Sequence, residues 1–146
     1  MFNKNLSVTG KVDVVVYDTE GNIKDERHVS NLVVDSGLDF IASRMEGTAS
    51  SIMSHMAIGS SSASPASGNT TLGSEEARVA ITSGVATSNS IAYVATFGAG
   101  VGTAALTEAG IFNASSSGDM LCRVIYSVIN KGAADTMTIT WTITIS

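Results

Sequence analysis

The chain has 146 residues, a mass of 15.0 kDa and a formal charge of −5, which fits one acidic domain. One cysteine and two histidines exclude a disulfide framework and leave too few ligands for a structural zinc site, and the acidic balance disfavours nucleic-acid binding. No apolar run approaches the roughly eighteen residues of a membrane span, so we expect no membrane contact and synthesis in a cytosol.

The charges are unevenly distributed along the chain. Residues 1–47 hold 13 of the 21 Asp, Glu, Lys and Arg residues, and the other 99 residues hold 8. Polarity in the larger part comes from serine, threonine and glycine. Neutral hydroxyl groups cost less to desolvate than charges, so such a surface suits contact with other subunits. An ordinary Ser/Thr-rich β-protein surface is an equal alternative.

The first predicted element is a strand over residues 11–18, KVDVVVYD. Val12, Val14 and Val16 share one face of it, as a period of two requires. EGN at residues 20–22 marks a turn, and IKDERHV follows. A charged run of this kind is typical of an exposed edge strand. The chain is therefore expected to open with a hairpin.

The next stretch, NLVVDSGLDFIASRMEG, changes to a helical period. Its apolar residues are spaced i, i+3, i+4 and i+7: Leu38, Ile41, Ala42 and Met45. Asp35 or Ser36 can cap the first turn, and Gly47 stands where a helix ends. We expect one short helix whose apolar stripe covers one end or face of a sheet.

Short strands then recur at intervals of about ten residues, with turn residues between them. They are HMAI at 55–58, ARVAIT at 77–82, IAYVATF at 91–97, EAGIF at 108–112, MLCRVIYSVI at 120–129 and MTITWTITIS at 137–146. The fifth is apolar on both faces, which predicts a central strand. In the last, apolar residues alternate with threonines and Trp141 is a candidate core anchor. The pattern favours an all-β, jelly-roll-like antiparallel sandwich of about eight strands with one helix.

Two loops interrupt this single domain, which we expect to span residues 1–146 with an extended segment at 1–9. Residues 59–74 contain the chain's one proline, six serines and no charge. This loop is predicted to be a flexible tip or an arm that orders against a partner. The loop at 97–106 is rich in glycine, but the third glycine of a dinucleotide motif would fall at Thr103. We interpret it as a tight connection.

No set of residues predicts catalysis. The sequence has no G-x-S-x-G elbow, and His28 lies in a charged run where a solvated role is expected. His55 begins a strand and fits a position at the edge of the core. Cys122 lies on a buried strand, where burial would raise the pKa of its thiol and make it inert. We therefore expect a protein that is not an enzyme and has no cofactor and no metal.

Two groups of charges have structural interpretations. Glu75, Glu76 and Arg78 follow the serine-rich loop, and a salt bridge there would fix its end. Glu108 precedes the apolar run AGIF, where a buried carboxylate needs an arginine or backbone amides. Arg78 and Arg123 are both candidate partners for it.

Five short sequence motifs follow one another along the chain: N-L-V-x-x-x-G, I-G, T-L-x-x-E-x-x-R, E-A-G-I-F and K-x-x-x-D-x-x-x-I-T-W-x-I. Their positions are Asn31, Leu32, Val33, Gly37, Ile58, Gly59, Leu72, Glu75, Arg78, Glu108, Ala109, Gly110, Ile111, Phe112, Lys131 and Trp141. In this order they resemble a family of small tailed-bacteriophage virion proteins related in pattern to tail-collar fibre domains. The match runs from about Gly10 to Ser146.

The resemblance implies a β-sandwich virion component that is a symmetric homo-oligomer, commonly a trimer, with no catalytic residues. The chain shows neither shaft nor repeat. This favours a capsid decoration protein on the capsid surface that binds the major capsid protein and bridges capsomers. A tail, neck or fibre adaptor is the alternative, and a glycan-binding receptor module is a further one.

Contacts with a partner are predicted for the residues before Gly10 and for the loop at 59–74. The candidate interface residues are Phe2, Asn3, Leu6, Ser61, Ser64, Pro65 and Asn69. The candidate structural residues are Glu75, Arg78, Glu108, Arg123 and Trp141.

Overall fold

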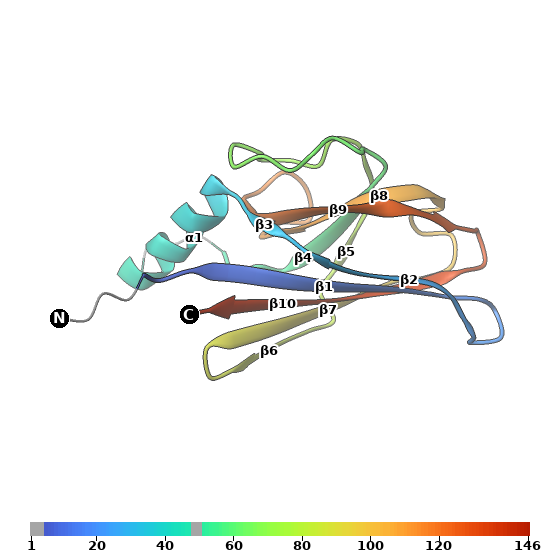
Figure 1. Ribbon diagram of the computed structural model, residues 1–146, viewed down its shortest axis with the longest axis horizontal. Helices are drawn as coiled ribbons and strands as arrows, with labels where there is room; N and C mark the ends of the chain where they lie inside the picture. Colours follow the sequence, from blue (N-terminus) through green and yellow to red (C-terminus); the bar gives the residue numbers. More distant parts are fainter. Residues whose placement is uncertain (1–4, 48–50) are drawn as a thin grey trace.

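A computed structural model describes residues 5–47 and 51–146, and it consists of two antiparallel sheets packed face to face (Figure 1). The first sheet has the order β2 (Ile23–Ser30), β1 (Val8–Tyr17), β10 (Thr136–Ile145), β7 (Ser90–Phe97) and β6 (Ser83–Thr87). The second has the order β3 (Leu32–Val33), β9 (Met120–Lys131), β8 (Ala104–Phe112), β4 (His55–Gly59) and β5 (Glu75–Ala80). The predicted all-β sandwich with one short helix is confirmed.

Within the described residues the sheets contain ten strands rather than about eight. The two additional strands are β3 and β6. β3 has only two residues, too few to show a period. β6 reads SGVAT and is exposed along its whole length, so it carries no apolar face for a pattern to reveal.

The centre of the first sheet is β10, the strand of alternating threonines. Val12 of β1 lies opposite Trp141, and both side chains are fully buried between the sheets. The threonines face outward and are half-buried. Trp141 is therefore a core anchor, as its place at the middle of the alternation predicts. On the other sheet, β9 lies between β3 and β8 and is buried along most of its first half.

The helix α1 (Asp35–Glu46) covers one end of the sandwich (Figure 1). The predicted apolar stripe is only partly right, because Leu38 and Met45 are exposed. Ile41 of that stripe packs against the core, and so does Phe40, which lies outside it. At Gly37 an added β-carbon would lie 2.1 Å from the carbonyl oxygen of Leu121 in β9. The helix lies directly against β9 at this point, and a residue with a side chain would not fit there.

The helix also begins differently from the prediction. Its N-cap is Val34, and no side chain caps it. The amide of Asp35 donates to the carbonyl of Ser67 over 2.8 Å, so the loop at 59–74 supplies the acceptor. Ser36 instead donates its hydroxyl to the carbonyl of Met120 over 2.7 Å. At the other end Gly47 is left-handed, with φ of 80°, as expected.

The sheet begins earlier than the predicted segment at residues 1–9 allows. β1 starts at Val8, and the amides of Ser7 and Ser146 donate to each other's carbonyls over 2.6 and 2.9 Å. This pairing with the end of β10 draws both ends into one sheet. Phe2 and Asn3 lie outside the described residues. No helix within residues 5–47 and 51–146 is long and apolar enough to cross a membrane.

Candidate functional site

The candidate site is the loop at residues 59–74, here called the serine loop, and the buried ion pair beneath it. Glu108 of β8 is 0% exposed and Arg123 of β9 is 2% exposed. The Nε of Arg123 donates to Oε1 of Glu108 over 3.1 Å. Nη2 lies 3.0 Å from the same oxygen, within ion-pair distance but without hydrogen-bond geometry. Of the two predicted partners for Glu108, the structure selects Arg123.

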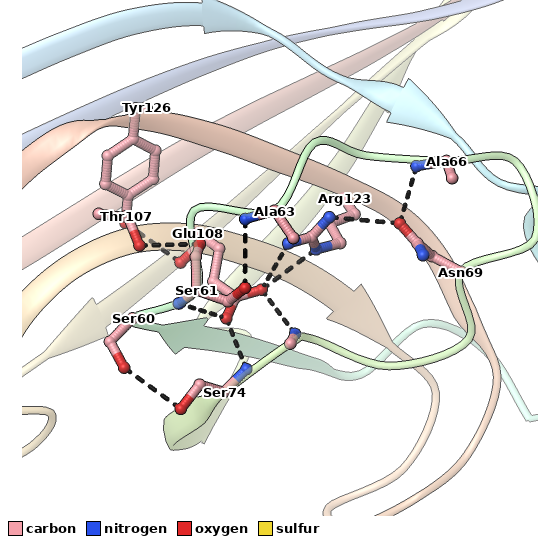
Figure 2. A network of polar contacts seen from close by, with 11 residues as sticks. Ser60, Ser61, Ala63, Ala66, Asn69, Ser74, Thr107, Glu108, Arg123 and Tyr126 are labelled. Atoms are coloured by element: carbon pink, nitrogen blue, oxygen red, sulfur yellow. Dashed lines mark hydrogen bonds and ion pairs between the residues drawn. The ribbon is translucent and has the colours of Figure 1, made fainter.

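The Glu108 carboxylate also holds both ends of the serine loop (Figure 2). Its Oε2 accepts hydrogen bonds from the amides of Ser61 and Ser74 over 2.9 and 2.8 Å. Its Oε1 accepts one from the amide of Gly73 over 2.8 Å. Three amides and one guanidinium satisfy the buried charge, and such charge-assisted bonds are the strong ones. The two ends of the loop are thereby fixed to one point in β8.

Neighbouring side chains add to this anchor, and no sequence pattern indicated them. The hydroxyl of Thr107 donates to the carbonyl of Ser61 over 2.8 Å. The hydroxyl of Tyr126 donates to the backbone carbonyl of Glu108 over 3.2 Å. Burial raises the pKa of Tyr126, and the charge of Glu108 raises it further, so the phenol stays protonated as a donor.

The middle of the serine loop is braced as well. Nη1 of Arg123 donates to Oδ1 of Asn69 over 3.2 Å, and the same oxygen accepts the amide of Ala66 over 2.8 Å. Leu72 is buried in a small apolar cluster beneath the loop. The other members of that cluster are Val34, Ala57, Phe112 and Met120. Arg123 therefore ties the middle of the loop to the carboxylate that ties its ends.

The predicted interface residues separate into two groups. Ser61 and Asn69 are half-buried and take part in these internal bonds, and the interface role expected for them stays a prediction. Ser64 is exposed, Pro65 is half-buried, and Leu6 is exposed at the start of the described chain. The outward surface of the loop is formed by residues without charge.

The predicted salt bridge between Glu75 and Arg78 is present, with contacts of 3.1 and 2.7 Å. The guanidinium of Arg78 also stacks 3.8 Å from the ring centre of Phe112. It also donates to the carbonyls of Ala114 and Ser117, which lie in the loop between β8 and β9. The pair of Glu75 and Arg78 therefore braces the loop between β8 and β9. At the serine loop itself, Glu76 accepts the hydroxyl of Ser60 over 2.7 Å.

The residues weighed for catalysis lie apart from this site. His28 is 62% exposed, and its Nδ1 lies 2.6 Å from Oδ1 of Asp13. His55 is half-buried beside the hydroxyl of Ser54. Cys122 is buried, and burial raises the pKa of its thiol well above the ordinary value. Across the described parts of the chain, no group of three or more His, Cys, Asp or Glu could hold a metal ion.

A cleft of about 550 Å³ lies between α1 and the strands β6 and β7. Phe40, Ile52 and Tyr93 give it apolar and aromatic walls, and Arg44 adds a cation. None of the predicted site residues lines it. A cleft of this size and lining can accept an apolar group, but its lining contains no histidine, cysteine or carboxylate to act as a base or nucleophile.

Comparisons with protein-family models, with curated proteins and with solved structures found no match. A functional proposal therefore rests on the geometry of the serine loop and on the short sequence motifs. The anchored serine loop is the feature on which the two agree.

Proposed function

We propose that the chain is a non-enzymatic structural protein of a bacteriophage particle, which decorates the capsid and stabilises it by bridging capsomers. Its partner is the major capsid protein, and the chain acts as a homo-oligomer, commonly a trimer, on the capsid surface. The observation that carries the proposal is the anchoring of an uncharged loop by the buried pair of Glu108 and Arg123.

The anchor supports a binding role for physical reasons. Each end and the middle of the serine loop is already fixed, so binding need not order it and loses less conformational entropy. Its exposed hydroxyl groups cost less to desolvate than charges would. A protein that binds only the assembled shell stabilises it by RT ln(1 + [L]/Kd). A pre-ordered neutral loop fits that task.

Three of the motifs on which the family resemblance is based lie together at this anchor. At Gly59 an added β-carbon would lie 2.3 Å from the carbonyl of Ser74 and 2.6 Å from Oε2 of Glu108. Leu72 fills the apolar cluster under the loop. Three separate motifs thus contribute to one structural unit, through Gly59, Leu72 and Glu108. This coincidence supports the assignment to the family's class of virion proteins.

The proposal is tested by imaging particles of the virus that carries the gene, with the protein located by a fused tag. Copies on the order of hundreds spread over the shell support decoration, because a shell is built from many symmetry-related sites. A ring of about six or twelve copies at the vertex or tail would instead establish the adaptor alternative. Binding on a glycan array would favour a receptor module.

A matched pair of variants tests the loop itself. Ser64→Lys adds a charge to the exposed part of the serine loop, and burying it against a capsid would be costly. Asn22→Lys adds the same charge at the exposed turn between β1 and β2. We expect the first to lower occupancy on the particle and the second to leave it unchanged. Equal occupancy of both variants would show that this loop does not contact the shell.

A further inference from the structure

The sheet edges of this protein are protected unequally. β2 carries Lys, Asp, Glu, Arg and His in succession, β3 has two residues, and β5 carries three charges and a bulge where it pairs with β4. Charges, bulges and short strands are the devices that stop edges from pairing with other chains. Among the four edges of the described sheets, β6 alone lacks all of them, since Ser83–Thr87 is uncharged, five residues long and in regular register with β7.

The neutrality extends well beyond β6. No charged residue lies between Arg78 and Glu108, a segment that includes β6, β7 and their connections. The opposite edge of the same sheet, β2, is the charged one. The first sheet is thus protected at one edge and open at the other. An open, uncharged edge is a template for pairing with another strand.

The hairpin fixes which backbone groups are open. β6 and β7 are joined by a two-residue loop, with Thr87 opposite Ser90. In such hairpins the pair flanking the loop exchanges hydrogen bonds, and every second pair does likewise. Gly84 and Ala86 therefore direct their amides and carbonyls away from β7. Two residues with open donors and acceptors can form a short antiparallel ladder with an identical strand.

We infer that β6 pairs antiparallel with β6 of a second copy of this chain. With Gly84 opposite Ala86 of the other copy, Val85 falls opposite its own counterpart and Ser83 falls opposite Thr87. The apolar side chain meets an apolar one and each hydroxyl meets a hydroxyl, so the strand is complementary to itself about a two-fold axis. The lack of charge removes the repulsion that would oppose a contact between two copies of an acidic chain.

The pairing joins two first sheets into one continuous sheet with ten strands, because each copy contributes five. The cleft between α1, β6 and β7 adjoins this edge, since Ser83 and Gly84 line it. A short edge contact still lies at the small end of specific interfaces, below about 1,200 Å². The association is therefore concentration-dependent. It is a two-fold contact that is independent of the proposed capsid role and separate from any three-fold assembly.

A disulfide provides the sharpest test of the register. Val85→Cys would place two thiols opposite each other in a pair with Cα atoms about 4.5 Å apart, which is within disulfide range. The native Cys122 is buried and does not compete. Ile23→Cys in β2 is the control, because Ile23 is 60% exposed and Val85 is 59% exposed on edges of the same sheet. Under mild oxidation we expect dimers on non-reducing gels from Val85→Cys. Equal or greater crosslinking of Ile23→Cys would overturn the pairing.

Mass in solution gives an independent test. Light scattering of the purified full chain at concentrations up to about 100 µM should give an average mass that rises toward an even number of copies, as a weak two-fold contact requires. Val85→Lys places a charge at the axis opposite its own copy and should halve that number, whereas Ile23→Lys should leave it unchanged. Circular dichroism of each variant verifies that it is folded. A wild-type mass that is monomeric or odd, or that Val85→Lys leaves intact, would refute the inference.

Discussion

Oε1 of Glu108 lies 3.1 Å from Nε of Arg123, and the two side chains come from adjacent strands, β8 and β9, with no more than 2% of either residue exposed. The pair closes a loop of sixteen residues, 59–74, that has no charge of its own. Desolvating an ion pair is costly unless further hydrogen bonds satisfy it. Here three loop amides and Asn69 supply those bonds, so the stability of the pair and the order of the loop depend on each other.

Glu108→Gln is expected to lower the free energy of unfolding by about 3–5 kcal/mol, because it leaves Arg123 buried without its counter-charge. Urea unfolding measures the loss. Hydrogen exchange should show faster exchange of the Ser61, Gly73 and Ser74 amides, which lose their charged acceptor. Adding Arg123→Met should restore part of the loss, since the unpaired charge is then removed.

Glu75→Gln is the matched control for this variant, because it removes a carboxylate whose side chain is 35% exposed. Its cost should be about 1 kcal/mol or less. If Glu108→Gln cost no more than Glu75→Gln, the buried pair would not be the anchor described above.

Trp141→Ala is expected to cost about 3–5 kcal/mol of stability, as truncation of a fully buried aromatic ring leaves a cavity. Its indole Nε1 has no hydrogen-bond partner among the described residues. Trp141→Phe therefore loses volume but no bond, and should cost clearly less than alanine. Thermal unfolding of the three proteins gives the order. A small loss in the alanine variant would contradict the role of the ring as a core anchor.

Local sequence patterns predicted the parts of the fold that depend on local chemistry. The alternation in residues 137–146 predicts β10 and its buried tryptophan, because neighbouring side chains on a strand point to opposite faces. The carboxylate before AGIF predicts a buried charge in need of a cation, and the structure supplies Arg123. Position along the chain could not decide between Arg78 and Arg123, since strand pairing brings Arg123 to the site.

Long-range contacts account for what the patterns missed. Asn69 and Arg123 are 54 residues apart, so nothing near Asn69 indicates that its side chain faces inward. Ser67 replaces the expected helix cap because the serine loop lies over the start of α1. The apolar spacing in the helix identified Ile41 but not Phe40, and it could not indicate that Gly37 lies directly against Leu121 of β9.

Gly59→Ala should lower stability by about 1–3 kcal/mol, the usual cost of overpacking a tight site. The new methyl group would lie 2.3 Å from a backbone oxygen of Ser74, which cannot move without loosening the Glu108 anchor. Gly68→Ala, in the same loop, meets nothing within 4 Å, so it should be neutral or stabilise by about 0.4–1 kcal/mol through the unfolded state. Denaturant unfolding of both variants checks this contrast. Equal effects would indicate that the loop end adapts freely.

The pair of His28 and Asp13 should make stability depend on pH in one direction. The hydrogen bond to Asp13 raises the pKa of His28 in the folded protein, and the charges of Asp13 and Glu26 act in the same sense. The protonated form is therefore favoured by folding. Its contribution is fully present below the unfolded pKa of about 6.5 and is lost as pH rises through the higher folded value.

NMR titration of the imidazole protons should locate the raised pKa of His28, with His28→Gln used to assign its signal against that of His55. Because the pair is exposed, the effect on melting temperature should be small and should weaken as salt is added. Asp13→Asn should lower the pKa of His28. Its melting temperature should approach that of the wild type above neutral pH, where the stabilising contribution of the pair is lost. An unchanged pKa in Asp13→Asn would contradict the assignment, because the hydrogen bond to that carboxylate is the largest cause of the rise.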